Sequence, residues 1–162
     1  MQYCMAIETD SHIVGDSDVR PAVPGELDIV FPAAVAMFKE EVGYDPSALD
    51  NSYKMRARSL IRSKRTYIKT APARDGHGER VIFKADVGAL AGNVAQLQGV
   101  WTAPDMRGQG IATRALASVI HHVRHQHAAR VSLYVNHYNT AAVHVYDKLG
   151  FTRVSDWATI QL

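Results

Sequence analysis

Apolar residues recur every three or four positions in four parts of the chain, and this spacing places them on one face of a helix. The pattern predicts helices over residues 25–42, 51–63, 110–128 and 139–149. Gly43 and Gly150 follow two of these segments, and glycine commonly ends a helix because it tolerates the left-handed backbone conformation. Pro32 lies inside the first helix, where its missing N–H predicts a kink.

Short runs rich in β-branched and aromatic residues lie between the helices and predict strands. These runs cover residues 66–70, 81–90, 94–102, 130–136, 151–154 and 157–162. The turn-forming sequence Ala91-Gly92-Asn93 joins the second run to the third, so we expect these two strands to form an antiparallel hairpin. Interleaved helices and strands of this kind predict one mixed α/β sheet with helices on both faces.

The first 18 residues differ in character from the rest of the chain. A short apolar opening, a candidate first strand, is followed by acidic residues, serines and a glycine, a composition typical of a linker. We therefore expect residues 1–18 to be an N-terminal extension or linker, and residues 19–162 to form a single domain that begins near Val19.

Composition narrows the class of protein. The chain has 162 residues, 47% apolar and 21% charged, which fits one globular domain. Its net charge of +2 gives no argument for nucleic-acid binding, and its one cysteine, Cys4, excludes an intramolecular disulfide and a thiolate zinc site. No stretch approaches the ~20 apolar residues that span a bilayer, and no signal-peptide pattern opens the chain. We therefore expect a cytoplasmic protein that does not enter a membrane.

Residues 100–113 are the segment most informative about chemistry, because they predict a strand end, a glycine loop and the first turn of a helix. A helix start has unpaired N–H groups and is electropositive, and glycines let the backbone approach an anion, so the segment is a candidate diphosphate cradle. A Walker loop would need Lys and then Ser or Thr after its last glycine, and a dinucleotide fingerprint would need a third glycine where Thr113 stands. Both motifs fit poorly.

What remains is the motif Arg-x-x-Gly-x-Ala, which begins at Arg107. It resembles the acetyl-coenzyme A pyrophosphate loop of the GNAT superfamily of N-acetyltransferases. Residues 133–151 resemble the second signature of that superfamily, in which an Asn begins a helix, a Tyr follows seven residues later, and Lys-Leu-Gly-Phe ends the segment. Asn139 and Tyr146 have this spacing. The resemblance implies a mixed, mostly antiparallel central sheet of six or seven strands flanked by about four helices.

The resemblance also implies which residues hold acetyl-CoA. Backbone groups at the strand end would pair with the pantetheine arm, backbone N–H groups of the glycine loop would hold the pyrophosphate, and two asparagines would hold the amide arm. These cofactor-binding residues are Val100, Trp101, Thr102, Arg107, Gly108, Gln109, Gly110, Ile111, Ala112, Thr113, Asn136 and Asn139. Tyr146 would be the catalytic acid that protonates the departing thiolate, because a phenol, with an ordinary pKa of ~10, stays protonated at neutral pH.

The motifs do not identify the base that deprotonates the amine. Many members of the superfamily carry a carboxylate on the strand before the glycine loop, but Gln96 and Gln98 stand there, and an amide is not a base. The candidates are an ordered water and four side chains, Asp86, His137, Glu40 and Glu41. Glu40 and Glu41 could instead bind the substrate, because a carboxylate favours the ammonium form of an amine.

Two groups of cationic residues admit more than one interpretation. His121 and His125 are one helical turn apart, as two metal ligands would be, but no third ligand of matching spacing follows. We therefore favour a solvated helix face and predict no metal site. Seven cations without an acid lie between Lys54 and Lys69, where they could bind nucleic acid or an anionic substrate. We favour a solvated helix face here too, and do not expect nucleic-acid binding.

The resemblance implies an N-acetyltransferase that moves an acetyl group from acetyl-CoA to a primary amine, of a small molecule or a peptide, by direct attack in a ternary complex. Cys4 is distant in sequence from both signatures, which argues against an acyl-cysteine route. The alternative is a noncatalytic acyl-CoA-binding domain that regulates or scaffolds a partner. Residues 32–43 are similar to the C-terminal acetyltransferase domain of an uncharacterised actinobacterial family, which implies an additional N-terminal domain. The resemblance also implies a homodimer paired through residues 157–162.

Overall fold

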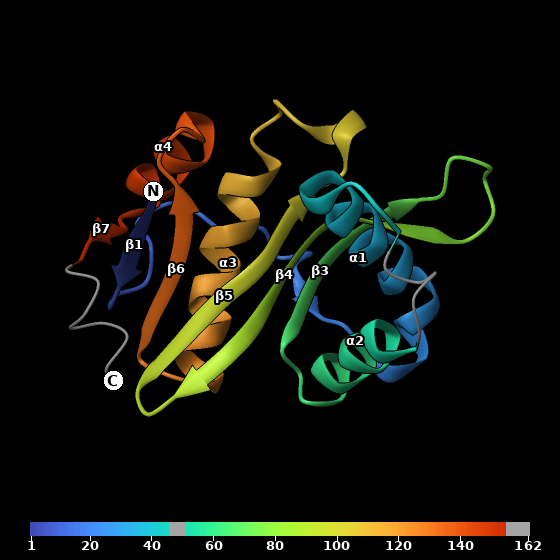
Figure 1. Ribbon diagram of the computed structural model, residues 1–162, viewed down its shortest axis with the longest axis horizontal. Coiled ribbons are helices and arrows are strands. Elements are labelled where there is room, and N and C mark those ends of the chain that lie inside the picture. The colour runs from blue at the N-terminus through green and yellow to red at the C-terminus, as the bar shows by residue number, and fades with distance from the viewer. Residues whose placement is uncertain (46–50, 155–162) are drawn as a thin grey trace.

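The computed structural model of the chain describes residues 1–45 and 51–154. Seven strands form one sheet in the order β2-β3-β4-β5-β6-β1-β7. Neighbouring strands are antiparallel except β5 and β6, which run parallel. This sheet and its flanking helices confirm the predicted mixed, mostly antiparallel α/β architecture (Figure 1).

The elements follow the predicted order, except that the sequence did not predict the two-residue strand β2. The strands are β1 (Gln2–Ile7), β2 (Arg20–Pro21), β3 (Thr66–Pro72), β4 (Glu79–Ala91), β5 (Val94–Thr102), β6 (Arg130–Asn136) and β7 (Thr152–Arg153). The helices are η1 (Pro24–Glu26), α1 (Leu27–Val42), α2 (Ser52–Arg62), η3 (Pro104–Met106), α3 (Ile111–Gln126) and α4 (Thr140–Leu149). The strand predicted over residues 157–162 lies outside the described residues.

The ends of two helices are set by the glycines that the sequence pointed to. Gly43 and Gly150 follow α1 and α4 with φ angles of 86° and 110°, in the left-handed region where only glycine is unstrained. Pro32 lies within α1, which continues through it as one helix. The predicted helix boundaries therefore hold to within a few residues.

The N-terminal strand corrects the expected domain boundary. β1 lies inside the sheet, between β6 and β7, and its residues from Cys4 to Ile7 are buried. The expectation that the folded unit begins near Val19 is therefore wrong for these residues. The sequence does not distinguish this six-residue strand from the start of a linker, because its partner in the sheet, β6, is more than a hundred residues away.

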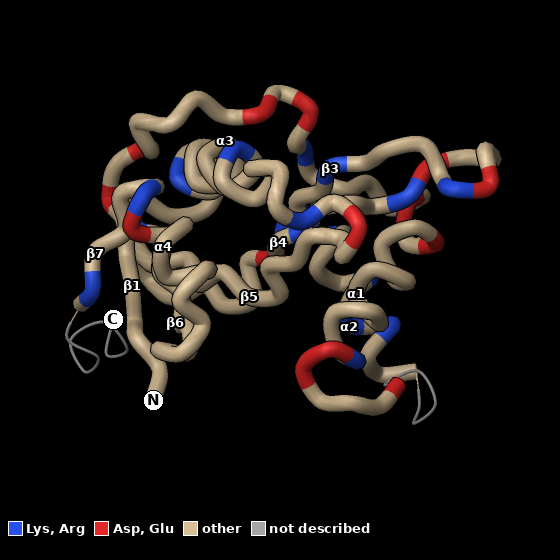
Figure 2. Tube along the Cα trace, turned by 90° about the horizontal axis from the view of Figure 1, so that it is seen from above, with Lys and Arg blue, Asp and Glu red and all other residues tan. Residues whose placement is uncertain are grey.

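The helices cover both faces of the sheet. α3 packs against one face with α4 in contact with it, and α1 and α2 lie on the other face (Figure 2). The apolar face predicted for α3 is buried, through Ala115, Leu116, Val119, Ile120 and Val123. None of the described helices is long and apolar enough to cross a membrane.

Candidate functional site

The site begins where β5 and β6 separate. Their parallel register covers only three pairs, from Val94 with Arg130 to Gln96 with Ser132. At Gly99 the φ angle is 60° and the pairing of β5 with β4 shifts register, which marks a bulge. Beyond the bulge β5 and β6 diverge (Figure 1), so in the described structure residues 100–102 have no register partner on β6.

A cavity of about 380 Å³ lies at this divergence. Seven of its lining residues are ones that the sequence singled out: Glu40, Glu41, Val100, Trp101, Thr102, Arg107 and Asn139. The structure thus brings together the end of α1, the end of β5, the glycine loop and the start of α4. We call this space the first cavity.

The glycine loop ends at Gly110, where α3 begins without a side-chain cap. Gly110 is the N-cap of α3, with a φ angle of 77°, and has no side chain that could accept a hydrogen bond from the first turn. That turn carries no acidic residue either. The N–H groups of Ile111, Ala112 and Thr113 are therefore available to an external acceptor, and the dipole of α3 favours an anion there.

Arg107 holds the glycine loop in place. Its Nη2 lies 2.9 Å from Glu40 Oε2, and its Nε donates to the carbonyl oxygen of Thr102 at 2.9 Å. Glu40 also accepts a hydrogen bond from Trp101 Nε1 at 3.1 Å. Glu40 thus connects α1 to β5 and to the glycine loop, and its carboxylate is occupied by these two donors.

The entry to the glycine loop is held by an ion-pair cluster that sequence reasoning missed. Asp105 in η3 binds Arg80 of β4 at 2.6 Å and Arg74 of the β3–β4 connection at 3.0 Å. The hydrogen bond from Arg80, with that from Arg74, holds the pKa of the Asp105 carboxyl well below its usual value. No local motif could predict this cluster, because its members lie about 25 and 30 residues apart in the chain.

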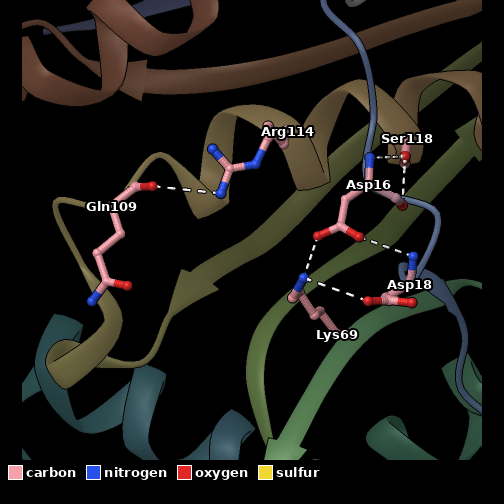
Figure 3. Close-up of polar contacts among 6 residues, drawn as sticks. All are labelled: Asp16, Asp18, Lys69, Gln109, Arg114 and Ser118. Carbon is pink, nitrogen blue, oxygen red and sulfur yellow. Dashed lines mark hydrogen bonds and ion pairs between the residues drawn. The ribbon is translucent and has the colours of Figure 1, made fainter.

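Arg114 is a second residue that sequence reasoning missed. It stands one turn into α3, and its Nη2 donates to the carbonyl oxygen of Gln109 at 3.5 Å (Figure 3). A Cβ on Gly110 would lie 2.9 Å from its Nη1. The signal was present, because residues four apart share a helix face and helical side chains lean toward the N-terminus. Arg114 adds positive charge beside the uncapped helix start.

The second signature occupies the start and the core of α4. Asn139 is the N-cap of α4, and its Oδ1 accepts the N–H of Ala142 at 3.2 Å. Asn136 ends β6, and its carbonyl accepts the N–H of Asn139 at 3.0 Å.

Tyr146 is only 8% exposed and packs edge-on against Phe151, with ring centroids 5.6 Å apart. Its burial raises the pKa of Tyr146 to about 12. Neither Asn136 nor Tyr146 lines the first cavity.

A second cavity, of about 150 Å³, adjoins the first. It lies between α1, α2, β4 and β5, and Val30, Ala34, Ala57 and Leu60 give it an apolar side. Met37 lines both cavities, and Gly99 of the second cavity precedes Val100 of the first. The two cavities therefore meet at the β5 bulge.

A buried ion pair lies on the polar side of the second cavity. Lys84 Nζ donates to Asp86 Oδ2 at 2.6 Å, and Thr66 Oγ1 donates to Asp86 Oδ1 at 2.7 Å. The side chains of Lys84 and Asp86 are 2% and 12% exposed. A Cβ on Gly99 would lie 2.9 Å from Asp86 Oδ2, so glycine is needed there both for its φ angle and for this close approach.

The structure separates the four side chains that could act as base. Asp86 alone of the four lines the second cavity, whereas Glu40 and Glu41 line the first. His137 Nδ1 lies 2.8 Å from the carbonyl oxygen of Met1, at the end of the β1–β6 pair. The second cavity is thus where an amine could reach a carboxylate beside the β5 bulge.

Cys4 and the cations between residues 54 and 69 also stood out in the sequence, and none of them lines the first cavity. Cys4 is opposite Tyr134 in the β1–β6 register, so it is near the second signature in space although distant in sequence, but it is 2% exposed. The cations between residues 54 and 69 spread over α2, β3 and the turn between them. Lys69 pairs with Asp16 (Figure 3), and Arg56 donates to the carbonyl oxygen of Gly88 at 2.8 Å.

Comparisons with known sequences agree with this geometry. The family model described as "Acetyltransferase (GNAT) family" matches residues 70–151. A curated mycothiol acetyltransferase of Thermobispora bispora is 37% identical over 62 residues, which are 38% of this chain and 21% of that protein. The match thus spans about a fifth of the curated relative's length.

Solved structures share the fold. A GNAT-family acetyltransferase from Colwellia psychrerythraea gives a TM-score of 0.68 at 18% identity, over 94% of this chain and 52% of that one. The aminoglycoside N-acetyltransferase AAC(6')-Iy, solved in complex with CoA, gives 0.61 at 19% identity, over 85% of this chain and 89% of that one. At these identities the likeness is one of fold.

Proposed function

The chain belongs to the GNAT family of acetyltransferases, and on this basis we propose that it moves an acetyl group from acetyl-CoA to a primary amine by direct attack in a ternary complex. The observation that carries the proposal is the uncapped start of α3 beside the divergence of β5 and β6. This arrangement offers an anion site and an unpaired strand end side by side, as a diphosphate with an extended amide arm requires.

Different segments of this chain would bind the pyrophosphate and the pantetheine arm of acetyl-CoA. The N–H groups from Gly108 to Thr113 would hold the pyrophosphate, and Arg114 would add charge beside it. The backbone of residues 100–102 would pair with the pantetheine arm, with Asn139 in the lining of the first cavity and Asn136 at the end of β6. Arg107 and Glu40 would position the loop rather than contact the phosphates, because they bind each other.

We assign the acceptor amine to the second cavity and the role of base to Asp86. Its carboxylate is held by Thr66 and Lys84 at the β5 bulge, next to the cleft for acetyl-CoA. A cavity of about 150 Å³ admits a group about as large as benzene. We therefore propose a small-molecule amine that inserts a compact apolar group between α1 and α2 while its nitrogen faces Asp86.

Tyr146 would supply the proton that the departing sulfur of coenzyme A needs. The amine nitrogen bonds to the acetyl carbon as the carbon–sulfur bond breaks, the amine gives up a proton to Asp86, and the sulfur receives one from the Tyr146 phenol. Burial raises the pKa of Tyr146 to about 12, which keeps the phenol protonated at neutral pH. Its position on α4, two turns from Asn139, is the basis for this assignment.

Calorimetric titration of acetyl-CoA, with coenzyme A and ATP as controls, tests the proposal first. We expect saturable binding of acetyl-CoA and coenzyme A but not of ATP. A panel of small primary amines and lysine peptides, assayed by release of free thiol, then tests transfer. Binding without turnover on any amine would favour the noncatalytic acyl-CoA-binding domain, and no binding would contradict the assignment of the cleft.

A further inference from the structure

Three side chains converge on the outer side of α3, away from both cavities. His121 and His125 lie one turn apart on this helix, with ring centroids 4.2 Å apart. Asp10 reaches them from the segment between β1 and β2, which passes over α3 (Figure 2). The sequence suggested the two histidines, and the fold supplies an acidic partner from 111 residues away.

The donor atoms of these residues point at one place. Asp10 Oδ2 lies 2.9 Å from His121 Nδ1 and 3.5 Å from His125 Nε2. One atom from each residue lies within 4.8 Å of the other two. Around a tetrahedral zinc ion, with bonds of about 2.0–2.2 Å, ligand atoms are about 3.3 Å apart. Small rotations of exposed side chains would therefore bring the three atoms to coordination distance.

We propose that Asp10, His121 and His125 form a binding site for a divalent transition-metal cation of the zinc type. Two imidazole nitrogens and one carboxylate oxygen are ligands that Zn²⁺ prefers, and hard cations such as Mg²⁺ prefer oxygen alone. The side chains are 58%, 55% and 40% exposed for His121, His125 and Asp10, so water can complete the coordination.

The surroundings orient the carboxylate for this role. Arg124 Nη1 binds the other oxygen of Asp10, Oδ1, at 2.6 Å, and leaves Oδ2 directed at the histidines. Hydrogen bonds of this kind, to the atom of a ligand that does not bind the metal, fix its direction. The same segment is held to α3 by Ser118, which donates to the carbonyl of Asp16 and accepts its N–H, both at 2.8 Å (Figure 3). A metal at Asp10 would strengthen the attachment to α3 that Arg124 and His121 already give this segment.

Titration of Zn²⁺ into the metal-free chain, without a histidine tag, tests the site by calorimetry. We expect one saturable site per chain for Zn²⁺, with no binding of Mg²⁺ at the same concentrations. His125→Ala should weaken Zn²⁺ binding at least tenfold, and Asp10→Asn should weaken it severalfold. Zn²⁺ should also raise the melting temperature of the unaltered chain, because a ligand bound only to the folded state stabilises it.

His144→Ala is the matched control, since it removes an exposed histidine of α4 that is outside the cluster. It should leave Zn²⁺ affinity unchanged. Because the substituted side chains are exposed, circular dichroism should show all variants folded. Absence of saturable Zn²⁺ binding, or binding that His121→Ala and His125→Ala leave unchanged, would overturn the proposal and leave a hydrogen-bonded cluster.

Discussion

Glu40 and Asp86 are both carboxylates beside the divergence of β5 and β6, and each accepts hydrogen bonds from two donors, but they face different cavities. Glu40 is bound by Arg107 and by Trp101, so it is committed to holding the glycine loop against α1. Asp86 faces the second cavity, where a substrate group can reach it. We therefore place proton transfer at Asp86 and treat Glu40 as a positioning residue.

Substitution of the proposed base is the sharpest test at this scale. Asp86→Asn keeps the size of the side chain but cannot accept a proton, so kcat should fall about 10²-fold while the affinity for acetyl-CoA is retained. Because Lys84 loses its charged partner, the free energy of unfolding should also fall, by up to about 3 kcal/mol. Glu41→Gln, which changes the candidate base at the end of α1, is the control and should keep its kcat. An unchanged kcat in Asp86→Asn would exclude this residue as the base.

The proposed acid can be tested with the loss of a single oxygen. Tyr146→Phe keeps the ring contact with Phe151, so we expect the melting temperature to stay near that of the parent chain while kcat drops about 10²-fold. Acetyl-CoA affinity, from calorimetry, should be nearly unchanged. Tyr138→Phe removes the hydroxyl of an exposed tyrosine nearby in the chain and serves as control. Equal losses of affinity and kcat in Tyr146→Phe would indicate a structural role instead.

Two helices that begin near the cleft differ in how their first turns are satisfied. α4 begins at Asn139, whose side chain accepts an N–H of the first turn. α3 begins at Gly110, which offers no such group. A glycine N-cap leaves N–H groups of the first turn without an acceptor and costs a helix roughly a few tenths of a kcal/mol relative to Asn or Asp, unless another acceptor is present. The difference is the physical argument for an anion at α3 and not at α4.

Two substitutions of Gly110 separate the effect of a negative charge at the start of α3 from the effect of side-chain size. Gly110→Asp and Gly110→Asn place side chains of nearly equal size at a left-handed position that both residues tolerate better than others do. The carboxylate would repel the pyrophosphate, so we expect Gly110→Asp to lower acetyl-CoA affinity at least tenfold more than Gly110→Asn, measured by calorimetry. Equal affinities in the two variants would contradict an anion site at the start of α3.

The sequence allowed the helices, the β4–β5 hairpin and the glycine loop to be predicted, because periodicity, turn residues and helix-start chemistry are local. It did not distinguish β1 from a linker, since the identity of a short strand depends on a partner elsewhere in the chain. The same limit applies to the binding of Arg107 to Glu40 and to the approach of Asp10 to His121. Such contacts exist only once the sheet has formed.

A core position on β1 tests whether this strand belongs to the folded unit. Met5 is fully buried between β6 and β7, so Met5→Ala should lower the free energy of unfolding by about 2–4 kcal/mol, measured by urea denaturation. Met55→Ala, at a residue of α2 that is 65% exposed, is the matched control and should change the free energy of unfolding little. If the two variants were equally stable, residues 2–7 would behave as a linker after all.

Across the whole molecule, ionised carboxylates join segments that are far apart in the chain. Among the described residues, the carboxylates with a lowered pKa are Asp10, Asp16, Glu26 and Asp105. For Asp10, the hydrogen bond from His121, with that from Arg124, lowers the pKa from 3.8 to about 2. These carboxylates hold the segment before β2, η1 and the entry to the glycine loop onto the sheet and α3.

Because these carboxylates stabilise the fold in their ionised form, we expect low pH to destabilise the folded chain. A carboxyl with a pKa lowered by folding binds protons more readily in the unfolded chain, so its stabilisation is complete above the unfolded pKa and disappears as pH falls through the folded pKa. We expect the melting temperature to fall as the pH drops from about 4.5 toward 2, the interval between the ordinary and the lowered pKa values. Asp10→Asn removes one such group and should flatten part of this decline, whereas Asp75→Asn, in the β3–β4 turn, should keep the parent slope. A melting temperature that is constant over this interval would mean that these ion pairs do not stabilise the folded chain.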